Sequence, residues 1–172
     1  SDVYKRQHIA PPAMGVVLNV GSAHLGEFGS RNNIAVAKGE IVEALQADGI
    51  AILNADDELV VGMASRTNAK VVTFSTQTKA DYYATGIVLD DVARATFTMH
   101  TPGGEHEVSL KVFGAHQVSN ALAAAAVGIE SGIDAAAVAE ALSNAHSVSV
   151  NRMDVSTCAD GVTVINDAYN AN

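Results

Sequence analysis

Short apolar runs alternate with longer segments of mixed polarity through the first half of the chain. Three mainly apolar runs predict strands that are buried on both faces. They lie at 16–20, 50–53 and 71–74. Two segments between them carry apolar residues at helical spacing and predict helices at 33–45 and 56–65, the second with Asp56 as its N-cap. This alternating order is typical of parallel βαβ units.

The pattern changes after residue 80. Alternating, turn-punctuated segments predict antiparallel strands, with Pro102-Gly103-Gly104 as a hairpin turn. These strands are expected at 82–88, 94–101 and 106–112, followed by helices at 117–131 and 134–144 and by strands at 152–157 and 162–165. Gly132 separates the two helices as a helix stop. The predicted fold class is α/β, a parallel sheet with helices plus an antiparallel section.

Composition narrows the function without naming it. The chain of 172 residues suffices for one domain, and it carries 10 basic against 19 acidic residues. This balance argues against a nucleic-acid binder but leaves room for a nucleotide, which needs few donors. The single cysteine, Cys158, excludes an internal disulfide and favours the cytoplasm. No apolar run is long enough to span a bilayer, so we expect no membrane partner.

Lys38 is the first candidate for chemistry. It follows Ile34 by four positions and precedes Ile41 by three, so the spacing predicts that it lies on the apolar stripe of its helix. A lysine there extends its amine to water, pairs with an acid, or is neutral. A neutral amine can take up carbon dioxide and become an anionic carbamate. Helix geometry alone leaves these alternatives open.

His24 is the second candidate. It lies in a glycine-rich loop just after a predicted parallel strand, where open α/β sheets bind ligands. A neutral imidazole there can ligate a metal or contact a phosphate. A solvated loop histidine fits the position equally well.

Two further groups are candidates for nucleotide contacts. His116 and Asn120 lie where a loop of small residues enters a helix, and helix N-termini favour anions. Capping and solvation are the alternative roles for them. Arg152 opens one predicted strand and Asp167 closes the next. A guanidinium can hold phosphate and a carboxylate can hold a ribose diol, although a surface ion pair is the simpler explanation.

Four segments, taken in order, match the motifs of one family. They are N-V-G-S-A-H-L at 19–25 continuing to A-K-G-E-I at 37–41, G-A-H-Q-V-S-N-A-L-A-A at 114–124, R-M-D at 152–154 and I-N-D-A-Y-N-A-N at 165–172. With these motifs the chain resembles the Mur ligases from about Pro12 to its end. It is most similar to the member that adds D-alanyl-D-alanine to UDP-MurNAc-tripeptide. Gln117, Asp154 and Asn166 depart from the usual family residues.

The resemblance implies both a reaction and the roles of the site residues. Mur ligases use ATP to phosphorylate a carboxylate, and an incoming amine displaces the phosphate. The resemblance makes Lys38, as a carbamate, and His24 the catalytic metal-site residues, with Mg²⁺ as the metal. It assigns cofactor contacts to the nucleotide, with Asn120 on adenine and Asp167 on ribose. It also makes Arg152 and His116 nucleotide-contacting residues. It also implies a cytoplasmic monomer.

The sequence also carries an informative absence. It holds no G-x-x-x-x-G-K-[ST] phosphate loop. We therefore expect residues 8–172 to be part of a Mur ligase central ATP-binding domain that lacks this loop and both flanking domains, and to be inactive alone. Residues 1–7 are expected to be extraneous or a frayed terminus. Alternatives are another Mur ligase, a folylpolyglutamate synthase-like ligase, or a non-catalytic nucleotide-binding or interaction module.

Overall fold

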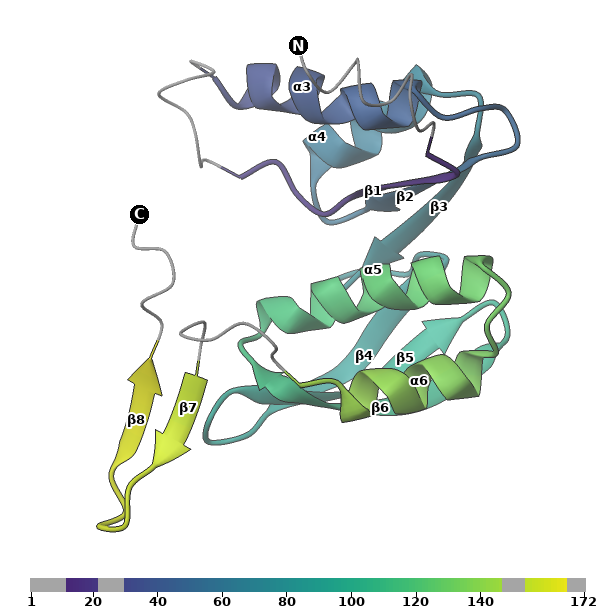
Figure 1. The fold of residues 1–172 in the computed structure, drawn as a ribbon. Coiled ribbons are helices and arrows are strands. Elements are labelled where there is room, and N and C mark those ends of the chain that lie inside the picture. The colour runs from purple at the N-terminus through teal and green to yellow at the C-terminus, as the bar shows by residue number, and fades with distance from the viewer. Residues whose placement is uncertain (1–11, 22–29, 147–153, 167–172) are drawn as a thin grey trace.

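A computed structural model describes residues 12–21, 30–146 and 154–166 (Figure 1). Its first six strands form one sheet in the order β1-β2-β3-β4-β5-β6, with β1 to β4 parallel and β4 to β6 antiparallel. The strands are β1 (Met14–Val17), β2 (Ile50–Asn54), β3 (Lys70–Ser75), β4 (Tyr82–Leu89), β5 (Arg94–Thr101) and β6 (Gly104–Phe113). The predicted α/β class, with its change from parallel to antiparallel pairing, is confirmed.

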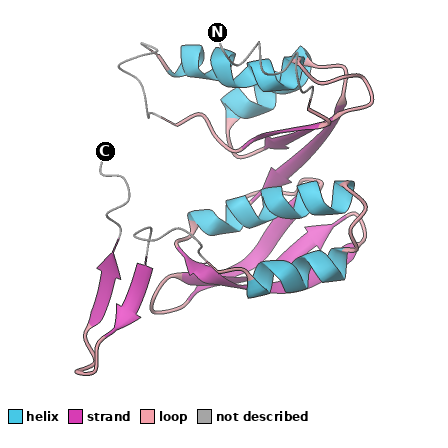
Figure 2. Ribbon diagram, in the orientation of Figure 1, coloured by secondary structure: helices cyan, strands magenta, loops and turns pink. Residues whose placement is uncertain are grey.

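Helices cover both faces of this sheet (Figure 2). One side carries α3 (Arg31–Glu43), α4 (Glu58–Val61) and the 3₁₀ turn η1 (Gly62–Arg66). The other side carries α5 (His116–Glu130) and α6 (Ala135–Asn144). In β2, Ala51 and Leu53 pack toward α3 while Ile52 packs toward α5. Because successive residues of a strand face opposite sides, the uninterrupted apolar run is explained by helices on both faces.

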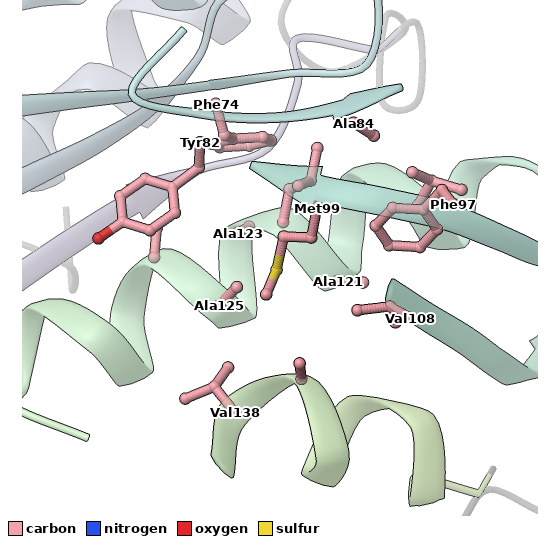
Figure 3. Packing of buried hydrophobic residues seen from close by; sticks show 14 of the residues in the cluster. Phe74, Tyr82, Ala84, Phe97, Met99, Val108, Ala121, Ala123, Ala125 and Val138 are labelled. Carbon is pink, nitrogen blue, oxygen red and sulfur yellow. The ribbon is translucent and has the colours of Figure 1, made fainter. Parts of the chain in front are cut away.

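The larger hydrophobic core lies between α5, α6 and strands β2 to β6 of the sheet (Figure 3). Phe74, Tyr82 and Met99 are fully buried on the sheet side. The alanines of α5, such as Ala125, face them. Small side chains bring the helix close to the strands, so the alanine-rich sequence of α5 follows from the large residues opposite it.

Gly132 ends α5 as predicted. It has φ of 90°, and the N–H of the following Ile133 donates to the carbonyl of Gly128 at 3.1 Å. This left-handed position after the helix is one that glycine adopts without strain. The turn returns the chain so that α6 packs against α5 and β6.

Several predicted boundaries shift by a few residues; for example, the helix predicted at 33–45 is α3 at Arg31–Glu43. The first strand ends at Val17 rather than at residue 20. The N-cap of α4 is Asp57 rather than Asp56, because the Asp56 carboxylate instead accepts hydrogen bonds from the amide and hydroxyl of Thr76, both at 2.8 Å. The predicted helix at 56–65 is a single α-helical turn that continues as η1.

The last two strands form a separate hairpin. β7 (Asp154–Thr157) and β8 (Thr163–Asn166) pair antiparallel with each other (Figure 1). Their turn includes Gly161, within the predicted turn segment. Across the three described ranges, no helix has both the length and the apolar character needed to cross a membrane.

Candidate functional site

A hollow of about 430 Å³ opens where β1 ends beside α3. Residues 16–19 line one side, and Ala37, Lys38 and Ile41 line the other. The hollow therefore lies at the carboxyl end of a parallel strand, where open α/β sheets place their ligands. Among the described residues that line the hollow, Lys38 is the only ionisable one.

Lys38 is held beside the hollow by its helix and by a backbone carbonyl. Ser30 caps α3 by accepting a hydrogen bond from the Asn33 amide at 3.2 Å, which sets where the helix begins. Two turns further on, the Lys38 amine donates to the carbonyl of Asn19 at 2.7 Å. Within the described ranges it forms no ion pair with a carboxylate.

The predicted position of Lys38 on the buried stripe of its helix is wrong. Its side chain is exposed, and the buried face of α3 consists of Ile34, Ala35, Gly39 and Val42. The buried positions follow a line through Ala35, Gly39 and Val42, which turns Lys38 toward the rim of that face. Of the alternatives left open by the sequence, the structure shows an amine that extends from the helix to a polar partner.

Three polar residues near the hollow were missed by sequence reasoning. Asn54 at the end of β2 is buried and donates to the carbonyl of Leu18 at 2.8 Å. Asp57 accepts from the amide of Val20 at 2.7 Å, and Arg31 lies 3.9 Å from the Asp57 carboxylate. Their one sequence signal is the acidic pair at 56–57 that follows β2, whose pattern predicts only a helix cap.

His116 and Asn120 lie at the start of α5, on the face of the sheet opposite Lys38. Both are exposed. The Asn120 amide donates to Gln117 at 3.0 Å, one turn earlier in the helix. The expected alternative of capping by His116 is not observed, because Ala115 occupies the N-cap position without a side-chain hydrogen bond.

The His116 ring lies directly against the backbone of Gly114, the residue two positions before it. Gly114 has φ of 105°, and a side chain at this position would overlap the His116 imidazole. In the first helical turn, the N–H of Gln117 donates to the Gly114 carbonyl at 3.0 Å and the N–H of Val118 donates to the Ala115 carbonyl at 3.2 Å, so the exposed His116 ring is the group that this helix end offers to a ligand. An exposed imidazole can hydrogen-bond to a ligand oxygen or to the edge of a base.

The remaining predicted site residues, His24, Arg152 and Asp167, lie outside the described residues. Asp154 pairs with Asn166 at one end of the β7–β8 hairpin. In the part of the chain that the structure describes, no three His, Cys, Asp or Glu side chains gather into a metal-binding cluster. Lys38 is therefore the one predicted metal-site residue whose surroundings are visible.

Comparison with known proteins identifies the family. The family model of the Mur ligase middle domain matches residues 3–128. The chain belongs to this family. Sequence relatives extend the match along nearly the whole chain, and the Mur ligase motifs singled out at 19–41 and 114–124 fall within the matched region.

Several relatives carry the same name. The chain is 54% identical over 164 residues to the UDP-N-acetylmuramoyl-tripeptide–D-alanyl-D-alanine ligase of Mycobacterium bovis, covering 95% of this chain and 32% of that Mur ligase. It is 37% identical to the Escherichia coli protein of that name, covering 94% and 36%. The chain thus spans about a third of the length of the relatives it matches.

Solved Mur ligase structures share the fold. MurF from Acinetobacter baumannii superposes with a TM-score of 0.87 at 33% identity, covering 95% of this chain and 35% of that one. MurF from Thermotoga maritima, solved in complex with ADP, gives a TM-score of 0.84 at 26% identity, covering 99% and 38%. These matches confirm the Mur ligase central-domain fold predicted from the sequence.

Proposed function

We propose that this chain is the central part of an ATP-dependent ligase that joins D-alanyl-D-alanine to UDP-MurNAc-tripeptide through an acyl phosphate. The observation that carries the proposal is the 54% identity to a ligase of that name across 95% of the chain. The protein would act in the cytoplasm on peptidoglycan precursors, as a monomer. Residues 8–172 would belong to the ATP-binding domain.

ATP is the proposed energy source. Support comes from the superposition on a MurF structure that was solved with ADP. At the start of α5, Asn120 is exposed and keeps an amide oxygen to accept from an adenine edge, and the His116 ring is exposed at the same helix end. Arg152 and Asp167 are proposed for phosphate and ribose on the motif match alone.

Lys38 and His24 are the proposed Mg²⁺ residues. The geometry around Lys38 fits a carbamate, because the amine is exposed and borders a hollow large enough for added atoms. A carbamate would supply the oxygen ligands that Mg²⁺ prefers. Bound Mg²⁺ would offset negative charge on the transferring phosphoryl group.

The choice among Mur ligases rests on similarity. The UDP-N-acetylmuramate–L-alanine ligase of Stenotrophomonas maltophilia is 36% identical to the chain but covers only 76% of it. The mycobacterial D-alanyl-D-alanine ligase is more similar and covers more of the chain. This difference favours D-alanyl-D-alanine over a single amino acid as the incoming amine.

The Lys38→Ala variant tests the proposal in a full-length protein that contains this chain. We expect phosphate release with UDP-MurNAc-tripeptide, D-alanyl-D-alanine and ATP to fall by about 100-fold or more, because the carbamate ligand is lost. Added short carboxylic acids should restore part of the rate. Lys79→Ala, which removes another exposed lysine, is the matched control and should leave the rate unchanged. Full activity of Lys38→Ala without added acid would contradict the assignment.

A further inference from the structure

The residues that follow β1 are held by side chains instead of by a neighbouring strand. Val20 is 1% exposed, and both of its backbone polar groups have charged partners. Its N–H donates to Asp57 Oδ2 at 2.7 Å. Its carbonyl accepts from Arg31 Nε at 3.1 Å and Nη2 at 2.8 Å. A guanidinium that donates twice to one oxygen restrains both its distance and its direction.

Leu18 is restrained in the same way. Its carbonyl accepts from the side-chain amide of Asn54 at 2.8 Å, and the other end of that amide accepts from the Asp56 N–H at 2.9 Å. Asn54 is 7% exposed, so its orientation is set by these two bonds within a buried site. The backbone is thus restrained on both sides of Asn19.

Asn19 lies between these two points and offers its carbonyl to Lys38. The bond from the Lys38 amine is 2.7 Å long. Since Leu18 and Val20 are held by residues from β2, α4 and α3, the direction of the Asn19 carbonyl is set by the fold and not by Lys38 itself. The acceptor is in place whatever the chemical state of the lysine.

We propose that Arg31, Asp57 and Asn54 are positioning residues that orient the carbamate of Lys38 through the Asn19 carbonyl. This inference rests on the proposed function. When the neutral amine attacks carbon dioxide, an N–C bond forms, one C=O electron pair moves to oxygen, and one N–H proton leaves to solvent. One N–H remains. Its donation to Asn19 fixes rotation about the carbamate nitrogen, so both carbamate oxygens face a defined direction.

Arg31→Lys and Asp57→Ser test the proposal in a full-length protein that contains this chain. Arg31→Lys keeps the charge but loses the forked contact with Val20. Asp57→Ser keeps an N-cap for α4 but shortens the reach to the Val20 amide. The matched controls are Arg94→Lys, at an arginine of similar exposure, and Asp134→Ser, at the N-cap of α6.

We expect both test variants to lower kcat by about 10- to 100-fold, the usual effect of losing a group that orients a metal ligand. Added bicarbonate or a short carboxylic acid should stimulate them more strongly than the wild type, and the KM for D-alanyl-D-alanine should not change. The carbamate carbon, followed by ¹³C NMR in ¹³C-bicarbonate, should lose intensity. The controls should match the wild type in all three measurements.

The outcomes separate this inference from the proposed function. If Lys38→Ala abolishes activity while Arg31→Lys and Asp57→Ser behave like their controls, the positioning role is wrong and the proposed function stands. If Lys38→Ala is fully active, the Lys38 site itself is wrong. The positioning role is also overturned if the loss in kcat of each variant is explained by its lower thermal stability while its carbamate signal stays unchanged.

Discussion

At the scale of single residues, Gly39 shows how closely α3 is approached from η1. The guanidinium of Arg66 lies against this glycine and donates to the carbonyls of Ala35 at 3.2 Å and Val36 at 3.0 Å. A Cβ at position 39 would overlap that guanidinium. The glycine therefore leaves room for the guanidinium on the helix next to Lys38, and its role does not depend on an unusual backbone angle.

Gly39→Ala should lower the free energy of unfolding, although alanine normally stabilises a helix by about 1 kcal/mol relative to glycine. Overpacking by the added methyl group costs about 1–3 kcal/mol. Displacing the guanidinium also breaks its hydrogen bonds to the carbonyls of Ala35 and Val36. Gly62→Ala is the control, since a Cβ there meets nothing within 4 Å. Urea denaturation followed by circular dichroism measures both. In the Arg66→Ala background, where the guanidinium is absent, Gly39→Ala should instead stabilise the protein by up to about 1 kcal/mol, and an equal cost in both backgrounds would contradict the clash.

At the scale of elements, α5 connects the parallel and antiparallel parts of the sheet. Its buried side chains are Val118, Leu122 and four alanines. Most of them are small, so the one large residue at the centre of the helix, Leu122, contributes a large share of its contact with the sheet. Leu122 is fully buried.

Leu122→Ala should reduce the free energy of unfolding by about 2–5 kcal/mol, because it removes buried methyl groups and leaves a cavity that the neighbouring alanines cannot fill. The same substitution at Leu89, which is 43% exposed, is the control. We expect Leu89→Ala to change stability by less than about 1 kcal/mol. Similar losses for the two variants in chemical denaturation would show that α5 does not anchor the core.

At the scale of the whole molecule, Glu130 joins the end of α5 to two strands. Its carboxylate accepts from the Lys70 amine of β3 at 2.6 Å and from the Tyr82 hydroxyl of β4 at 3.1 Å. Burial, followed by the charge and hydrogen bond of Glu130, raises the pKa of Tyr82 well above its usual value of 10.0. The hydroxyl is thus kept protonated where the sheet changes from parallel to antiparallel pairing.

This raised pKa predicts alkaline sensitivity. The folded state binds the Tyr82 proton more tightly than the unfolded chain, so the contribution is complete below about pH 10 and is lost as the pH rises toward the folded-state pKa. The free energy of unfolding should therefore fall more steeply above about pH 10 in the wild type than in Tyr82→Phe. Tyr83→Phe, at the next residue, should retain the wild-type slope. Parallel pH profiles for all three proteins would contradict the assignment.

Much of the fold was predictable because its signals are local. The buried runs, the alternating strands and the glycine after α5 each act within a few residues, and they predicted the element order that is observed. The Lys38 and Asn120 candidates came from their positions on predicted helices, and the family motifs assigned their roles. Arg31, Asn54 and Asp57 could not be found in this way, since their contacts with residues 18–20 span 11, 36 and 37 positions in the sequence.

The sequence by itself determined the strands, the helices and the family, because hydrophobic period, turn residues and motif spacing are properties of neighbouring residues. Only the tertiary structure decided which side of α3 faces the sheet. Packing against β1 and η1 buries Ala35, Gly39 and Val42, and leaves Lys38 exposed at the hollow with its amine on Asn19. Which side of α3 is buried depends on contacts between segments that are distant in the sequence. The residues of one helix, taken alone, do not specify those contacts.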